Sequence, residues 1–201
     1  MKIFSLAIMA WREGYLEKPI IFSNGFDLSS FGFFQRSSVK EFIIFFSRTL
    51  MQKTSRGQRQ SIDHEEYVCH IHLRSDGLGA IAVCDQEYPQ RVAYTALSNL
   101  VNEFHTLHGE VWPTLKVDTP LPFPQMDTAI VDFQNPANAD KLTKIHEDLE
   151  KTISIVHKTI DSVLDRGTKL ENLVKQSEDL GMQSKLFYQN AASANKCCVI
   201  M

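Results

Sequence analysis

The strongest constraint on the fold of this chain is a long heptad pattern in its C-terminal third. Sixteen positions from Leu142 to Ala194 alternate spacings of three and four residues without a break. This spacing is typical of the buried seam of a coiled coil, here over residues 138–196, and one continuous helix of it would extend for roughly 80 Å. The bulky apolar members of the seam are Leu142, Ile145, Leu149, Val156, Val163, Leu170, Leu173, Leu180 and Phe187.

The seam has weak positions, so we do not expect the helix to be stable alone. Gly167 and Gly181 each cost about 1 kcal/mol relative to alanine inside a helix. Four further seam positions are small and polar: Thr152, Thr159, Ser177 and Ser184. We therefore expect residues 138–196 to be largely unfolded, or docked on the chain's own N-terminal domain, until partner helices arrive.

Arg166 lies at the centre of the seam, where an apolar residue is normal. A buried charge there costs several kcal/mol unless partners satisfy it. Its guanidinium offers five donors, which suits acceptors such as glutamine amides from other helices in the same layer. The alternative is an ordinary coiled coil that tolerates one arginine, whose stem is buried while its head reaches solvent.

The first 134 residues have the composition of a folded domain, with a core over 1–108, a proline-rich connection over 109–125 and a short helix over 126–134. Residue periodicity predicts strands near 2–9, 19–26, 60–63, 67–74 and 78–85, and helices near 37–50 and 91–108. A capping box of Ser38 and Glu41 is expected to begin the first helix. The order predicts an α+β fold with a mixed sheet covered by helices.

The last five residues read Cys197-Cys198-Val199-Ile200-Met201. A cysteine followed by two aliphatic residues and methionine predicts farnesylation of Cys198. One prenyl chain gives only marginal membrane binding, and residues 191–196 hold a single basic residue rather than a polybasic patch. We therefore expect a palmitoyl group on Cys197 as the second anchor, and cycling between cytosol and membrane. Residues 1–10 are expected to form a buried strand rather than a signal peptide, because prenyl transfer is cytosolic.

Other functional classes find little support. The formal charge of −3, without a basic cluster that contains aromatic residues, does not indicate nucleic-acid binding. We expect no cofactor, metal or small-molecule substrate. His70 and His72 share one face of a predicted strand, where we expect an exposed polar surface rather than zinc. Cys69 is expected to be a core thiol. Acyl transfer onto Cys197, dependent on Cys69 or Cys84, is the least favoured alternative.

Two regions resemble a known family. Residues 159–173, with Val163-Leu164, Arg166 and Lys169-Leu170 at their centre, resemble the middle of an R-SNARE motif of the synaptobrevin kind. Residues 31–38 and 57–62 resemble segments of a longin domain, in the subgroup that ends in Cys-Cys-a-a-X rather than a transmembrane helix. The resemblance implies a profilin-like longin domain with a five-stranded mixed sheet flanked by helices, followed by a long coiled-coil helix.

The same resemblance implies a function. An R-SNARE drives fusion of a vesicle with its target membrane by forming a parallel four-helix bundle with three Q-SNARE helices, in which Arg166 would supply the central ionic layer. The implied locations are the cytosol and the cytoplasmic face of Golgi, endosomal, vacuolar or ER membranes, with the protein peripheral and lipid-anchored. The rival hypothesis is a lipid-anchored coiled-coil adaptor or tether that does not drive fusion.

The first predicted helix is apolar on more than one face. One stripe suits the core of the domain: Val39, Ile43, Phe46 and Leu50. Phe42 lies at the edge of this stripe, and Phe45 points away from it. We therefore expect Phe42 and Phe45 to receive the chain's own C-terminal segment or its lipid, which would give a closed cytosolic form.

Overall fold

The computed structural model describes residues 1–135, 153–157, 159–165 and 167–197. Its centre is a sheet whose first five strands come from the N-terminal half and pair antiparallel in the order β2-β1-β5-β4-β3. This confirms the predicted succession of strands and helices up to residue 108. The strands are β1 (Ile3–Ala10), β2 (Ile20–Phe26), β3 (Gln58–His64), β4 (Tyr67–Leu73) and β5 (Leu78–Asp85).

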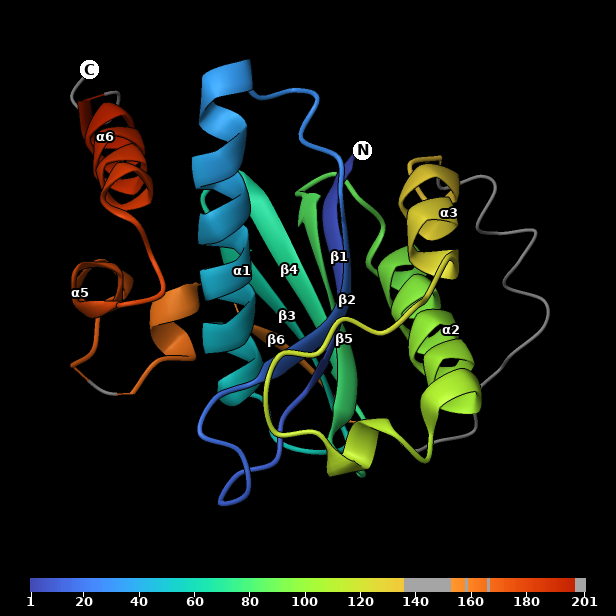
Figure 1. Ribbon diagram of the computed structural model, residues 1–201. Coiled ribbons are helices and arrows are strands. Elements are labelled where there is room, and N and C mark those ends of the chain that lie inside the picture. The colour runs from blue at the N-terminus through green and yellow to red at the C-terminus, as the bar shows by residue number, and fades with distance from the viewer. Residues whose placement is uncertain (136–152, 158, 166, 198–201) are drawn as a thin grey trace.

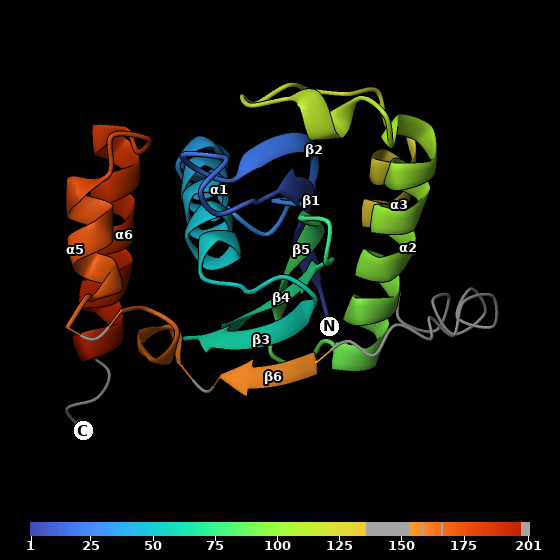
Figure 2. The same ribbon diagram turned by 90° about the horizontal axis from the view of Figure 1, so that it is seen from below.

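Helices cover both faces of the sheet (Figure 1). On one face lies α1 (Arg36–Gln52), and on the other lie α2 (Gln90–His108) and α3 (Gln125–Asp132). Figure 2 shows a further layer outside α1, made by the C-terminal helices. Each face of the sheet therefore has its own apolar contacts. On the α2 side, for example, Phe22 of β2 stacks on Phe104 with ring centroids 5.5 Å apart.

The proline-rich connection is an ordered part of the domain rather than a free linker. It begins with the 3-10 turn η2 (Trp112–Thr114), and the side chains of Trp112 and Phe123 are buried. It also runs along the outer edge of β2: the Asp118 carboxylate accepts a hydrogen bond from the Ile21 backbone, and the Leu121 N–H donates to the Phe22 carbonyl, both at 2.9 Å. This edge of the sheet is therefore covered.

The capping box expected at Ser38 and Glu41 is absent. The helix α1 begins at Arg36, directly after the 3-10 turn η1 (Phe33–Gln35), and Ser38 is buried inside it. A cap serves the free N–H groups of the first turn, so a residue beyond the helix start cannot act as one. The Glu41 carboxylate bonds instead to the C-terminal segment.

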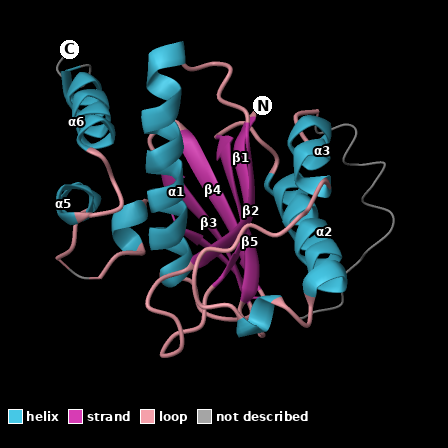
Figure 3. Ribbon diagram, in the orientation of Figure 1, coloured by secondary structure: helices cyan, strands magenta, loops and turns pink. Residues whose placement is uncertain are grey.

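The C-terminal half contains helices, as predicted, but they do not form one continuous rod. The described residues form a strand, β6 (Ile153–His157), a 3-10 turn, η4 (Ile160–Ser162), and two helices, α5 (Leu170–Gln176) and α6 (Met182–Cys197) (Figure 3). The strand β6 adds to the sheet parallel to β3, from Gln58 opposite Ile153 to Ile62 opposite His157, which makes the sheet mixed. The β-branched residues Ile153, Ile155 and Val156 favour this pairing at an open edge.

The face of β4 that carries two histidines is buried, so the prediction that they lie on an exposed polar surface is wrong. His70 and His72 are each 2% exposed because α2 packs over them. The Ser61 hydroxyl links His70 Nδ1 to the Tyr94 hydroxyl, with both distances 2.8 Å. Cys69, on the other face of β4, is fully buried, as predicted. The described residues contain no cluster of three or more metal-binding side chains.

Burial gives His70 a measurable effect on stability. Loss of solvation lowers its pKa from 6.5 to about 4, so the folded domain favours the neutral ring. The unfolded chain binds a proton near pH 6.5, and the stability contribution is therefore lost as the pH falls below that value. We expect the free energy of unfolding to fall by about 2 kcal/mol between pH 7.5 and pH 5 through this residue. Urea unfolding of the wild type and His70→Gln checks this, and an equal fall in both proteins would contradict it.

Candidate functional site

The helix α1 contacts other elements on two sides. Its predicted core stripe faces the sheet and is buried, which confirms that part of the prediction. Phe42 and Phe45 lie on the side away from the sheet and are half-buried there. The helix α6 packs against this side, as the views in Figures 1 and 2 agree. The outer side of α1 is therefore the surface on which the C-terminal segment sits.

Aromatic rings connect the two helices. The Phe42 ring stacks on Tyr188 of α6, with ring centroids 5.1 Å apart and planes 19° apart. On its other side Phe42 stacks on Phe46 at 5.8 Å, and Phe46 contacts the His64 ring at 5.3 Å. Such pairs contribute about 0.5–1.5 kcal/mol each beyond the area they bury. The row of rings thus extends from the end of β3 through α1 to α6.

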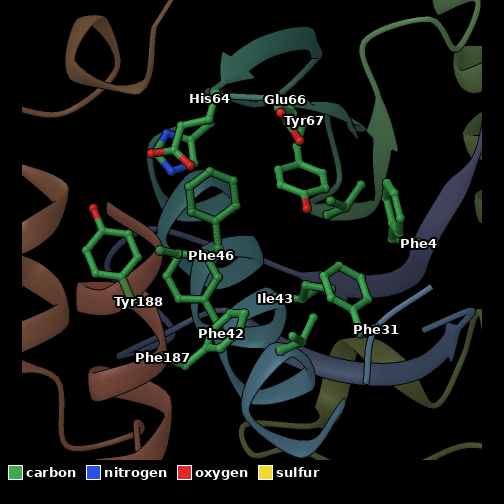
Figure 4. A pocket seen from close by; sticks show the side chains of 14 residues that line it. Phe4, Phe31, Phe42, Ile43, Phe46, His64, Glu66, Tyr67, Phe187 and Tyr188 are labelled. Atoms are coloured by element: carbon green, nitrogen blue, oxygen red, sulfur yellow. The ribbon is translucent and has the colours of Figure 1, made fainter. Parts of the chain in front are cut away.

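A pocket of about 240 Å³ lies beside this row of rings. Figure 4 shows Tyr188 and Phe187 of α6 on one side of it and Phe31 and Phe4 on the other, with α1 between. Most of the lining is carbon from aromatic and aliphatic side chains, which suits an apolar chain rather than a polar ligand. Ala191 of α6 also lines the pocket.

Polar contacts fix the position of α6 along α1. The Glu41 carboxylate accepts hydrogen bonds from the Gly181 backbone N–H at 3.2 Å and the Ser184 hydroxyl at 2.6 Å. Gly181 directly precedes α6, so this carboxylate satisfies a backbone N–H at the positive end of that helix. The residue that was expected to cap α1 therefore serves the first turn of α6.

Ion pairs hold the preceding part of the segment. Arg48 of α1 pairs with both Asp118 of the proline-rich connection and Asp179, and Lys18 donates to Asp179 at 3.0 Å. The hydrogen bond from Lys18, with the nearby Arg48 charge, lowers the pKa of Asp179 below its usual value of 3.8. Lys53 pairs with Asp165 at the C-terminal end of α1.

The predicted seam residues differ in how deeply they are buried in the docked segment. Leu170 and Leu180 are 3% and 4% exposed, and Val163, Leu173 and Phe187 pack partly buried against the core. Val156 lies in β6 and is 62% exposed. Five of the predicted residues lie outside the described part of the chain: Leu142, Ile145, Leu149, Arg166 and Cys198. The backbone of α6 ends at Cys197.

Sequence reasoning missed three buried residues that lie off the seam. Ile160, Leu164 and Val174 are 5%, 6% and 0% exposed in the docked segment. In a coiled-coil helix Ile160 and Val174 flank the seam and Leu164 faces outward, and polar residues are the norm at both kinds of position. Their apolar character was the available signal that the segment has a second contact surface besides its seam.

The described residues contain no helix that is long and apolar enough to cross a membrane. Residues 28–130 match the longin family, described as a regulated-SNARE-like domain, and residues 141–200 match the synaptobrevin family. The chain is a longin-domain R-SNARE. It therefore belongs to a non-enzymatic family whose members act in vesicle fusion by binding other SNAREs.

This R-SNARE has relatives along its whole length. It is 48% identical over 201 residues to the VAMP-like protein YKT61 of Arabidopsis thaliana. It is 42% identical to two synaptobrevin homologs, ykt6 of Schizosaccharomyces pombe over 202 residues and YKT6 of Saccharomyces cerevisiae over 203 residues. All three comparisons cover 100% of both chains. The similarity thus includes the folded domain, the C-terminal segment and the connection between them.

The ion pairs of Asp179 give the first test of the docking surface, which is the outer side of α1 that the C-terminal segment covers. Its lowered pKa keeps the carboxylate charged at neutral pH, and the contact is lost only as the pH falls through that pKa. Because Asp179 is 45% exposed, we expect Asp179→Asn to weaken docking by only about 0.5–1 kcal/mol. Hydrogen exchange of the α6 amides should then rise by about two- to fivefold. Glu178→Gln, an exposed neighbour, is the control, and equal exchange in both variants would contradict the role of Asp179.

Proposed function

We propose that this R-SNARE drives fusion of a vesicle with its target membrane by forming a parallel four-helix bundle with three Q-SNARE helices. Residues 138–196 form one helix of that bundle, and Arg166 donates to glutamine side chains in its central layer. The observation that carries the proposal is the unbroken seam of sixteen positions with one arginine at its centre, in a chain of the synaptobrevin family. Burial of the seam on folding supplies the free energy that draws two membranes together.

Two lipids hold the protein on its membrane. Cys198 carries a farnesyl group and Cys197 a palmitoyl group, so the protein is peripheral when doubly lipidated and cytosolic with one lipid. It cycles to the cytoplasmic face of Golgi, endosomal, vacuolar or ER membranes. The sequence of the last five residues supports the lipidation, and similarity to the three relatives extends through that tail.

The docked segment is the closed, cytosolic form of the protein. Leu170 and Leu180 support this, because side chains buried in the docked arrangement are unavailable to a bundle at the same time. Phe42 and Phe45 are the docking residues on α1. The aromatic pocket beside Phe42 shelters part of a lipid chain, since its lining is apolar and Ala191 near the end of α6 reaches it. Docking and bundle formation are thus mutually exclusive.

The closed form predicts faster assembly when docking is weakened from either side. Phe42→Glu removes a ring stack and places a charge against Tyr188, and Val174→Ser alters a fully buried residue that lies off the seam. Each should destabilise docking by about 1–3 kcal/mol and leave the seam intact. Mixing the full chain with candidate Q-SNARE helices, followed by circular dichroism, should then show assembly faster by about tenfold or more.

Small-angle scattering on the same variants measures the opening directly. The control is Val131→Glu, which changes a 69% exposed residue on α3, in the layer on the other side of the sheet. The control should keep wild-type compactness and assembly rate. If Phe42→Glu and Val174→Ser remain as compact and as slow as this control, the closed form is wrong.

Arg166 distinguishes a fusion SNARE from an adaptor. Residues 138–196 should gain helix cooperatively, with high thermal stability, only with a complete set of three glutamine-type helices. Arg166→Leu leaves the partner glutamines unsatisfied and should lower the melting temperature of that bundle, because unpaired buried amides are costly. Circular dichroism measures both. Helix formation by the segment alone, indifferent to partners and to Arg166→Leu, would instead support the coiled-coil adaptor.

A further inference from the structure

Two adjacent aromatic side chains stand in solvent with no role in the docking surface. Phe33 and Phe34 of η1 are 77% and 92% exposed, and their rings pack edge to face with centroids 5.5 Å apart. They lie in the connection that leads into α1, whereas Phe31 just before them lines the aromatic pocket. Paired exposed rings of this kind mark a contact surface more often than isolated ones.

Two cations, Arg36 and Lys40, follow this pair in the first turns of α1. The Arg36 guanidinium is fixed by donating to the carbonyl oxygens of Phe31 and Ser29, at 3.1 and 3.4 Å, and the Lys40 ammonium lies over the Phe26 ring. Neither cation has a carboxylate partner in the described parts of the chain, since the Glu41 carboxylate is directed to α6. The surface therefore combines exposed rings with unmatched positive charge, which suits an anionic interface.

This surface lies at the same end of the molecule as the end of α6, the last described element before the lipidation tail. The docked segment runs along α1 from Asp165 beside Lys53, past Asp179 beside Arg48, to Ser184 beside Glu41. It thus advances towards the N-terminal end of α1, where η1 lies. Figure 1 shows the first turn of α1 and the last turn of α6 at the same end of the molecule.

We propose that Phe33 and Phe34 insert into the interfacial layer of an anionic bilayer, with Arg36 and Lys40 against lipid phosphates. Phenylalanine is among the apolar residues that anchor peripheral segments at the boundary between headgroups and acyl chains, and basic side chains are attracted to the surface potential of anionic lipids. The contact goes beyond SNARE assembly and needs no covalent lipid. It supplies the weak second signal that a singly prenylated chain requires before it is held firmly by acylation.

Vesicle sedimentation of the full, unlipidated chain tests the proposal. The wild type should bind phosphatidylcholine vesicles that contain phosphatidylserine, bind pure phosphatidylcholine more weakly, and lose affinity at high salt. Phe33→Ser/Phe34→Ser should bind on the order of tenfold more weakly. The control Leu107→Ser/Val131→Ser changes two exposed apolar residues on α2 and α3 and should bind as the wild type does. Equal binding by both double variants would overturn the proposal.

Insertion of the aromatic pair into the bilayer is measured with a tryptophan in place of Phe34. Phe34→Trp places an indole in the proposed contact, while the native Trp11 and Trp112 are buried and give a constant background. Vesicles with brominated acyl chains should quench the new fluorophore and leave the wild-type emission unchanged. An unquenched Phe34→Trp variant on sedimented vesicles would overturn the proposal of insertion. Because no lipid is attached, this result is independent of whether Cys197 and Cys198 are modified.

Discussion

The structure depends on one helix that is apolar on two sides. The inner side of α1 completes the core of the sheet, and its outer side carries Phe42, stacked between Phe46 and Tyr188. A helix of this kind has no stable position on the surface of a domain, because one apolar side always faces water unless a second layer covers it. The C-terminal segment provides that layer. The domain and the segment are therefore complementary parts of one folded unit in this structure.

The segment is consistent with two folded states, and its residues show a compromise between them. Off-seam residues such as Leu164 and Val174 are buried in the docked state, although a bundle would leave them outside its seam. Gly167 has φ of +91°, a left-handed conformation that favours glycine and lets the chain turn between η4 and α5. The same glycine weakens a continuous helix by about 1 kcal/mol. Each state is thus less stable than a sequence optimised for it alone would allow.

Local patterns were sufficient to predict the strands and helices of the folded domain. An Asp-Gly pair is typical of a tight hairpin turn, and Asp76-Gly77 forms the turn between β4 and β5, where Gly77 has φ of +94° and the Asp76 carboxylate accepts from the Leu78 N–H at 3.0 Å. Alternation and helical spacing predicted the other elements. The prediction of Ser38 as a helix cap was wrong because a capping pattern is valid only at the true start of a helix, and that start depends on η1. The histidines of β4 were misplaced because only the fold reveals that α2 covers them.

The docked arrangement could not be predicted because it depends on an open sheet edge and on contacts distant in sequence. Periodicity assigns residues 153–157 to a helix, whereas pairing with β3 makes them a strand. The excess apolar character of α1 indicated that something covers Phe42, but it did not identify Tyr188 or the second role of Glu41 as an acceptor for α6. Charge pairs such as Arg48 with Asp179 join residues far apart in the chain and leave no local pattern.

The two edges of the sheet are covered by different parts of the chain, and the proposed release of the segment would therefore be cooperative. The edge of β2 is covered within the domain by Asp118 and Leu121, whereas the edge of β3 is covered by β6. Release of the segment would therefore remove the strand pairing, the ion pairs along α1 and the ring stack of Tyr188, all of which lie between Ile153 and Tyr188. These contacts are linked in series, so loss of one lowers the effective concentration that holds the next. The charged side chains of β3, such as Arg59 and Asp63, then protect the freed edge from pairing with another chain.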